Sequence, residues 1–523
     1  MGLRIHRELF ASPIWIALEC LAMITKSAQK TLKSTWRIAL CSLAVTVLAA
    51  TGLAQTTIAP VQATASPSGG YEVVEARLGR FDWENGEGNS NFHGFLLPAS
   101  LPVVSADGRH VLYSYVAKTG CATPGSCLIL DGQPISLEKG VTALNGALAL
   151  SAEGQHVAYA ADDNGTYWMV IDGHAGPKHN DHGFLALPSG LTFSPDGKRL
   201  AYTTANDDPR HYKRLAVVDG ESSPEYDQVL NLNFSPNSKR VAFAAKTGKQ
   251  WTVVVDGHPG ASYDEVYGPI FSPDSDSVAF AAREEKKWFV VVNGKAGPEY
   301  EGMVENGAGL AKLADIRYGA LAFSPDSKHL AYAAKRGGKW VMVVDGQEGE
   351  GYNQVASPVF SFDGKRVAYS AGRYLSKESG WRVVVDGQEG PLFFETFPAV
   401  FSPDGKHLAY GAKKAQWAVV VDGKVISAPG ELGNWALSPD GNHLAYATKT
   451  RQGFSLAGPF GGGGWSVFLD GKPGSEFTVI IPGTLHFGID GALEFLAARE
   501  ESHSGLGTEK HGALYRVKYT LTP

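Results

Sequence analysis

The sequence predicts an all-β protein built from about ten copies of a four-stranded repeat. A Ser-Pro-Asp-Gly-like turn recurs at intervals of 36 to 52 residues, and a strand ending in Val-Val-Asp-Gly or a variant follows each of the first nine copies. The 62 glycines and 28 prolines are typical of many turns and short elements. The turns begin at Ser105, Ser151, Ser194, Ser235, Ser272, Ser324, Ser361, Ser402 and Ser438, with a degenerate tenth copy at Gly488.

Each copy resolves into four strands, named A to D. Residues 191–193 exemplify strand A and 200–202 strand B, and the Ser-Pro-Asp-Gly turn between them favours a hairpin. Strand C is exemplified by 251–255 and closes in Asp-Gly, a tight-hairpin signal, and strand D is expected to carry Tyr-acidic-x-Val, as at 226–229. Strands B and C are apolar on both faces, so both faces must be covered. Four-stranded sheets stacked face to face around a ring, a β-propeller, provide that cover.

The two ends of the repeat region predict how the ring closes. Residues 71–74 match strand D but precede any strand A, whereas the last copy has strand A near 484–487, B at 493–497 and C at 514–521, and no D. We therefore expect the N-terminal segment to supply the missing strand, which removes two open sheet edges. Ten copies fit one large ring or two smaller rings, and closure between the two ends favours one circuit.

The repeat resembles the TolB-type, WD-like propeller repeat: an apolar strand, Ser-Pro-Asp-Gly-Lys, Leu-Ala-Tyr, then a strand ending in Asp-Gly. The resemblance covers roughly residues 71–523 and implies the fold. Similar propellers precede the catalytic domain of prolyl-oligopeptidase-like enzymes, and one forms half of the periplasmic protein TolB. We expect neither that hydrolase domain nor the N-terminal domain of TolB here, so neither activity is carried over.

The N-terminal region predicts export. Lys26, Lys30, Lys33 and Arg37 precede an uncharged run at 38–53, and Gly52 and Ala54 suit the −3 and −1 positions of a cleavage site. Residues 1–54 are therefore expected to be a signal peptide, with Met23 a possible true start, followed by a linker at 55–70 and the propeller at 71–523. The expected location is periplasmic or secreted, with no membrane span once the leader is cleaved, and an uncleaved anchor is the alternative.

Two cysteines, Cys121 and Cys127, remain after the expected cleavage and are predicted to form a disulfide in an oxidising compartment. The formal net charge of −6 argues against binding of a phosphate backbone, so no nucleic-acid partner is expected.

Sequence variation is concentrated at one end of the repeats. In an antiparallel meander the A–B and C–D turns lie at one end of each blade, and the B–C and D–A connections lie at the other. The first set is nearly uniform, whereas the second varies in length, near 117–127, 203–213, 371–380 and 449–464 (B–C) and 75–100, 180–190 and 302–320 (D–A). Binding residues are often found on such loops. The candidates are Trp83, Phe92, His93, His182, Arg210, His211, Tyr212, Arg317, Tyr318, Arg373, Tyr374, Phe454 and Phe460.

Several other patterns have simpler interpretations. Six tryptophans, Trp251, Trp288, Trp340, Trp381, Trp417 and Trp465, each lie five residues before the Asp or Asn that closes strand C. This shared position indicates packing between blades more than a sugar-binding rim. The repeated Asp of Asp-Gly is interpreted as turn chemistry. The cluster His179-Asn180-Asp181-His182 and the acidic loop at 82–87 are weak metal and calcium signals, so no metal site is predicted.

The sequence lacks Gly-x-Ser-x-Gly, His-Glu-x-x-His, the Gly-x-x-x-x-Gly-Lys phosphate loop and the dinucleotide fingerprint, and no catalytic residue or cofactor is predicted. The sequence favours an exported, non-enzymatic propeller that binds a protein or envelope polymer through its B–C/D–A face. Two alternatives stay open: a propeller hydrolase or lyase acting on carbohydrate or peptide, and a structural or sensory ectodomain retained by an uncleaved leader.

Overall fold

The computed structural model describes residues 71–83, 103–105, 108–117, 125–135, 142–163, 166–176, 179–180, 189–206, 211–303, 321–356, 358–374, 379–450, 464–501 and 510–521. All regular elements in these ranges are β-strands, in ten antiparallel sheets. In this part of the chain no helix has the length and apolar character needed to cross a membrane.

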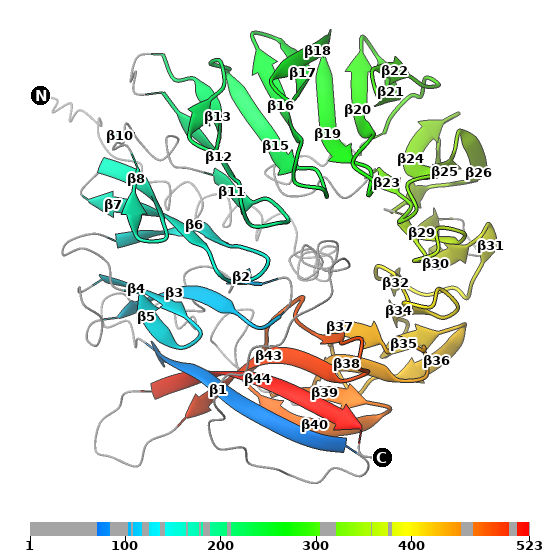
Figure 1. Cartoon of the computed structure of the whole chain (residues 1–523). Helices are drawn as coiled ribbons and strands as arrows, with labels where there is room; N and C mark the ends of the chain where they lie inside the picture. The colour runs from blue at the N-terminus through cyan, green and yellow to red at the C-terminus, as the bar shows by residue number, and fades with distance from the viewer. Residues whose placement is uncertain are drawn as a thin grey trace, which may run out of the picture. The chain divides into compact units, whose positions relative to one another are not determined.

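The sheets form the ten blades of one β-propeller, which confirms the predicted fold class (Figure 1). In chain order, the first five blades contain β2 (Val103–Val104), β3 (Val111–Ala117), β4 (Gly125–Leu130) and β5 (Gln133–Ile135) in blade 1; β6 (Thr142–Leu150), β7 (Val157–Asp163), β8 (Thr166–Ile171), β9 (His174–Ala175) and β10 (His179–Asn180) in blade 2; β11 (Ser189–Phe193), β12 (Leu200–Ala205), β13 (Arg214–Val218) and β14 (Glu221–Ser222) in blade 3; β15 (Gln228–Phe234), β16 (Val241–Thr247), β17 (Gln250–Val255) and β18 (His258–Tyr263) in blade 4; and β19 (Glu265–Phe271), β20 (Val278–Glu284), β21 (Lys287–Val292) and β22 (Lys295–Ala296) in blade 5.

The remaining blades follow the same pattern, with the inner strand split in blades 7, 8 and 10. They contain β23 (Ala322–Phe323), β24 (Leu330–Arg336), β25 (Lys339–Val344) and β26 (Gln347–Tyr352) in blade 6; β27 (Gln354–Val355), β28 (Val359–Phe360), β29 (Val367–Tyr374), β30 (Ser379–Val385) and β31 (Gln388–Glu389) in blade 7; β32 (Glu395–Thr396), β33 (Val400–Phe401), β34 (Leu408–Lys413), β35 (Trp417–Val421) and β36 (Lys424–Ser427) in blade 8; β37 (Leu432–Leu437), β38 (Leu444–Lys449), β39 (Trp465–Leu469) and β40 (Lys472–Phe477) in blade 9; and β41 (Val479–Ile480), β42 (His486–Phe487), β43 (Leu493–Glu501), β44 (Lys510–Leu521) and β1 (Tyr71–Trp83) in blade 10.

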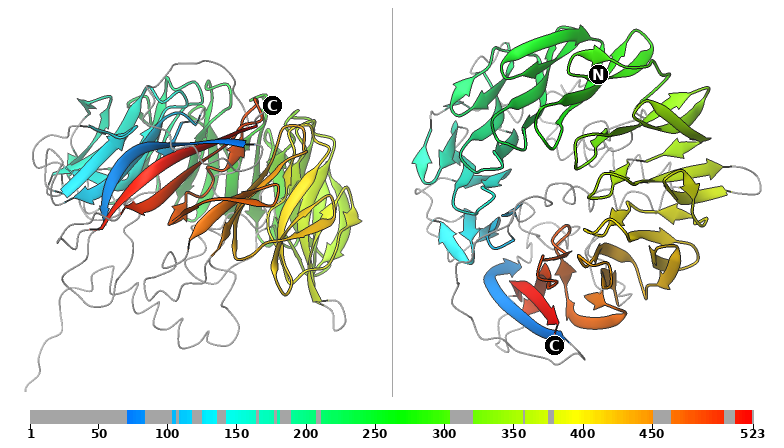
Figure 2. Two further views of the ribbon diagram at one scale, coloured as in Figure 1. Left: turned by 90° about the horizontal axis from the view of Figure 1, so that it is seen from below. Right: turned by 45° about the vertical axis from the view of Figure 1, so that its right-hand side comes forward.

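The hydrophobic core lies between neighbouring blades, as the two apolar faces of strands B and C require. Ala201 and Ala216 of blade 3, for example, pack in one cluster with Val229, Phe243 and Val254 of blade 4. Small alanines of strand B alternate with large side chains, so that adjacent sheets approach closely. The two views in Figure 2 show the sheets following one another side by side.

Strand D differs from its predicted sequence pattern. In blade 4 it is β18, which follows the Asp256-Gly257 turn directly and ends at Tyr263, opposite Trp251 of strand C. Glu265 then begins β19, the inner strand of blade 5. Tyr-acidic-x-Val is therefore the crossover from one blade to the next, because its tyrosine is the last residue to pair with strand C. The assignment of this whole motif to strand D was wrong.

The predicted ring closure is confirmed. β1 pairs antiparallel with β44, from Tyr71 opposite Leu521 to Trp83 opposite Lys510. Val73 is 6% exposed within the closing blade, and Glu75 forms an ion pair with Arg499 at 3.0 Å. The strand continues to Trp83, so the first part of the predicted 75–100 loop is a strand that pairs with the long β44.

Candidate functional site

Hydrogen bonds assign the described connections to two faces. The A–B and C–D turns share a face, because the Asp219 carboxylate of a C–D turn accepts the Leu200 N–H at the start of strand B. The B–C hairpins and the crossovers share the other, since Asp227 of a crossover accepts the Gly248 N–H of a B–C hairpin. We name them the turn face and the loop face. The turn face thus carries the turns whose sequences are nearly uniform. The loop face carries the connections whose lengths vary.

On the turn face, the repeated Asp of Asp-Gly has a structural role. In blade 3 one carboxylate oxygen of Asp219 accepts the Leu200 N–H at 3.0 Å, and the other accepts Arg199 Nε at 2.7 Å. The aspartate and glycine have positive φ angles of 53° and 84°, as a tight hairpin turn requires. We name this contact the turn pair, and it recurs as His110–Asp131, His156–Asp172, Arg199–Asp219, Arg240–Asp256, His329–Asp345, Arg366–Asp386, His407–Asp422 and His443–Asp470.

Neighbouring turns are also bonded to each other. Arg199 donates through its terminal nitrogen to the carbonyls of Ser238 and Lys239 in the next blade. Ser238 Oγ in turn accepts the Asp196 N–H of the preceding blade at 2.9 Å. The polar groups of this face therefore largely satisfy one another, which supports the structural interpretation of the repeated aspartates.

The six tryptophans occupy one position at the start of strand C, and five of them pack in hydrophobic clusters. Trp288 and Trp340 are each 8% exposed, and Trp251, Trp417 and Trp465 lie partly buried against hydrophobic clusters. Lys246 and Lys413 lie over the rings of Trp251 and Trp417, at 5.5 and 4.5 Å. The packing interpretation therefore fits this position.

Crossover carboxylates order the loop face. Asp227 pairs with Lys213 at 2.5 Å as well as with the Gly248 N–H, and Glu301 accepts the N–H groups of Gly337 and Gly338. These hydrogen bonds lower the pKa of both carboxyl groups. The acidic residue of the crossover motif thus fixes the B–C hairpin of the following blade.

Most of the sequence-predicted binding residues remain predictions. These lie outside the described residues: Phe92, His93, His182, Arg210, Arg317, Tyr318, Phe454, Phe460 and Cys121. Cys127 lies in β4 and Trp83 is the last residue of β1, and the structure describes only the backbone of these two residues. The disulfide therefore also remains a prediction, as do the leader at 1–54 and the linker at 55–70, which lie outside the described residues.

Four predicted residues can be placed. His211 is exposed, and Tyr212 packs beside Tyr167 of blade 2. Arg373 pairs with Glu389 at 2.6 Å and lies 4.8 Å from the ring centre of Tyr352 in blade 6. Tyr374 is 49% exposed, and its hydroxyl donates to Gln354 Oε1 at 2.9 Å. Arg373 thus links two blades, whereas Tyr374 presents its ring to solvent.

Sequence reasoning missed a second exposed aromatic on the loop face. Phe394 is 65% exposed and begins the crossover into blade 8, where its N–H donates to the Lys413 carbonyl. The corresponding crossovers into blades 4, 5 and 6 carry Asp227, Asp264 and Glu301. Aligning the crossovers would have revealed this replacement.

Sequence reasoning also missed Tyr167 and Arg214. Each lies five residues before the Asp that closes strand C, which is the position of tryptophan in blades 4 to 9. His179 and Tyr226 pair with them, as Tyr263 pairs with Trp251. His179 thus occupies the tyrosine position, as expected. Within the described ranges, no three His, Cys, Asp or Glu side chains are grouped closely enough to hold a metal ion.

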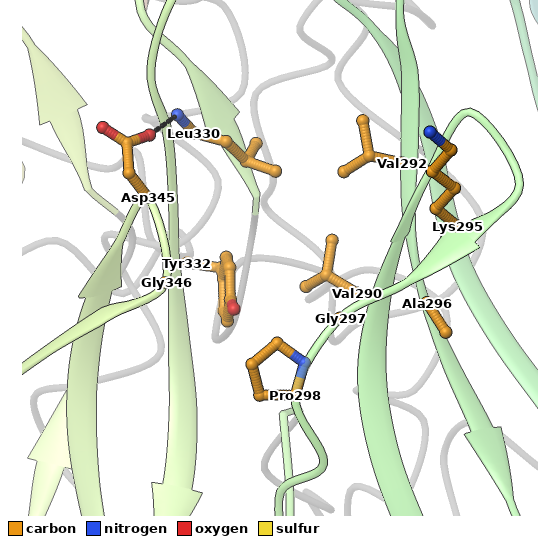
Figure 3. A pocket seen from close by; sticks show the side chains of 10 residues that line it. All are labelled: Val290, Val292, Lys295, Ala296, Gly297, Pro298, Leu330, Tyr332, Asp345 and Gly346. Carbon is orange, nitrogen blue, oxygen red and sulfur yellow. Dashed lines mark hydrogen bonds between the residues drawn. The ribbon is translucent and has the colours of Figure 1, made fainter.

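A hollow of about 230 Å³ lies between blades 5 and 6 (Figure 3). Val290, Val292, Leu330, Tyr332 and Pro298 surround it, with Lys295 at one edge. At the opposite edge, the Asp345 carboxylate is already bonded to His329 and to the Leu330 N–H. The hollow is thus an apolar gap beside a turn pair.

Comparison with known proteins shows no family for this chain. No family model matches the chain, and no curated protein matches it. Similar solved structures include a eukaryotic initiation factor, at 13% identity over 70% of this chain and 98% of that one, with a TM-score of 0.40. TolB from Acinetobacter baumannii has 17% identity over 55% and 78%, with a TM-score of 0.24. The β-propeller domain of the Trilobed protease from Pyrococcus furiosus has 12% identity over 65% and 98%, with a TM-score of 0.27. None of these assigns an activity to this chain.

Proposed function

We propose that this protein is an exported, non-enzymatic scaffold that binds a protein or cell-envelope polymer through its loop face. The observation that carries the proposal is a pair of exposed aromatic residues near one strand end on the loop face; among the described residues the turn face exposes one aromatic residue, Phe362. On the turn face, the recurrent polar side chains bond to one another within and between blades. On the loop face, Tyr374 and Phe394 expose aromatic rings near the start of strand C of blade 7. Exposed aromatic residues on a rigid scaffold are common anchors of interfaces.

The orientation of Tyr374 is fixed, which favours binding. Its hydroxyl donates to Gln354, and its backbone N–H donates to Asn353 Oδ1 at 3.0 Å. A ring already held in place loses little conformational freedom when a partner covers it.

Capture experiments with matched variants test this proposal. Residues 55–523 are immobilised and exposed to envelope extract, with and without prior protease treatment to separate protein from polymer partners. Tyr374→Ala with Phe394→Ala should abolish capture. Phe362→Ala with Ile489→Ala removes two exposed apolar residues of the turn face, 44% and 94% exposed, and should leave capture unchanged. Loss of capture only in the turn-face variant, or no capture by the parent protein, would refute the proposal.

Export has its own test, because its support is the sequence of residues 1–54. Sequencing the N-terminus of the exported protein should give Gln55 as the first residue. An intact leader on a membrane-bound chain would contradict cleavage and favour the anchored alternative.

A further inference from the structure

Blades 2 and 3 differ from the following blades at the start of strand C. Blades 4 to 9 carry tryptophan there, whereas these two neighbouring blades carry Tyr167 and Arg214. The Tyr167 side chain reaches into blade 3, where its hydroxyl lies 3.1 Å from Thr204 Oγ1 and its ring packs beside Ala205 and Tyr212. Ala205 is paired with Arg214 across strands β12 and β13. Both replacements therefore belong to one junction on the loop face.

Arg214 is a cation for which the described residues offer no counter-charge. No carboxylate of the described residues lies within ion-pair distance of its guanidinium, and one terminal nitrogen is buried without a hydrogen-bond partner. The acidic residues that follow it bond elsewhere, Glu225 to Asn206 and Asp227 to Lys213. Burial lowers the pKa of the Arg214 guanidinium, an effect that nearby Tyr167 opposes, and arginine still stays charged. A partly buried charge of this kind is costly unless something pairs with it.

The surroundings of Arg214 indicate the chemistry of its partner. The guanidinium is planar and suits two-point contact with a carboxylate. Among the described residues, the Tyr167 hydroxyl lies near Arg214 and contacts the Thr204 hydroxyl, and Tyr212 is only partly buried. A ligand for this place would put an anionic group beside Arg214 and would contact hydroxyl and aromatic side chains. An acidic sugar meets these requirements, because it carries a carboxylate, several hydroxyls and an apolar ring face.

We propose that Arg214, at the junction of blades 2 and 3, binds the carboxylate of an acidic sugar unit of a cell-envelope polymer. This inference rests on the proposed scaffold function, since it assigns one contact of the partner to the loop face. It also explains why this junction lacks the tryptophan that packs in the following blades.

Binding of small probes tests the assignment. Glucuronate is titrated into residues 55–523 by NMR or calorimetry, with glucose as the uncharged sugar and N-acetylglutamate as the carboxylate without a sugar ring. Glucuronate should bind. Arg214→Gln should weaken the affinity for glucuronate by about tenfold or more, because a charge-assisted hydrogen bond is lost. Lys249→Gln removes an exposed positive charge from the loop face of blade 4 and should have no effect. Arg214→Trp restores the residue of blades 4 to 9 and should raise the melting temperature while losing glucuronate binding.

Three results would overturn the proposal: no binding of glucuronate, unchanged binding in Arg214→Gln, or equal binding of N-acetylglutamate, which would indicate a peptide partner. A lower melting temperature in Arg214→Trp, with glucuronate binding unchanged, would show that Arg214 is structural. These titrations use no extract, so their failure is distinguishable from failure of the capture experiment.

Discussion

Asn293 Nδ2 donates a hydrogen bond to Ser277 Oγ at 3.1 Å, in the position where eight other blades pair an aspartate with arginine or histidine. Asn293 Oδ1 still accepts the Val278 N–H, as the aspartates do at the start of strand B. Blade 5 has therefore replaced both members of the turn pair by neutral groups. The paired replacement shows that the two positions interact directly, so that neither charge remains alone.

This relationship predicts the result of a double-mutant cycle. Ser277→Arg combined with Asn293→Asp should stabilise the protein by about 0.5–1 kcal/mol more than the sum of the single substitutions, the range expected for a partly exposed pair. Urea denaturation of the four proteins measures this coupling. Additive effects would show that the turn pair contributes no interaction energy at this position.

Ser238 should stabilise the protein through its hydroxyl, despite an unfavourable backbone conformation. It replaces the usual turn glycine at a φ of 65°, and its Oγ accepts the Asp196 N–H of blade 3. Ser238→Ala should lower the free energy of unfolding by about 1 kcal/mol, because the bond is lost and the strain stays. Ser238→Gly loses the same bond but relieves about 1 kcal/mol of strain, so it should be the more stable variant. Urea midpoints measure both, and the reverse order would contradict this account.

Acid should weaken the turn face. Ser438 Oγ and two groups of Asn442 donate to Asp440, which lowers the pKa of its carboxyl to about 2. Because the folded-state pKa lies below the unfolded value of about 3.9, this stabilisation is complete above that value and is lost as pH falls towards 2. Asp440→Asn should therefore destabilise the protein at pH 7 and approach the parent protein near pH 2. Urea midpoints at several pH values test this, with the exposed Glu221→Gln as control. A pH-independent difference would refute it.

Two truncations should distinguish the linker from the strand that closes the ring. Deleting residues 55–68 should be nearly silent if that stretch is a linker. Deleting 55–75 removes the buried Val73 and the Glu75 partner of Arg499, and it should lower the melting temperature by several degrees or cause aggregation. Calorimetry of both proteins is the measurement, and equal melting curves would show that 71–75 closes nothing.

The fold could be predicted from sequence because each signal was local and repeated. Ser-Pro-Asp-Gly, Asp-Gly and the apolar strands identified strands A to C, and the missing fourth strand of the last copy predicted the closure. The crossover could not be placed in the same way, because Tyr263 and Asp264 are adjacent in sequence but end one blade and begin the approach to the next.

The candidate site was less accessible to sequence reasoning. From the sequence, Arg373 was expected to be an exposed residue of a loop. In the structure it pairs with Glu389 on the outer strand of the same blade and lies over Tyr352 of the preceding blade. Arg214 was overlooked because the absence of a counter-charge among the described residues is visible only in three dimensions.

The pairing of β1 with β44 has a consequence for biosynthesis. Among the described residues, β1 is the first strand to be synthesised and must wait for β44, the last one. The contacts Tyr71–Asp470 and Glu75–Arg499 span 399 and 424 residues. Contacts so distant in sequence form slowly, since a long loop must close first. Until synthesis ends, blades 1 and 9 each lack a neighbour and expose an apolar sheet face. We therefore expect a nascent or C-terminally shortened chain to depend on chaperones to a degree that the finished ring does not.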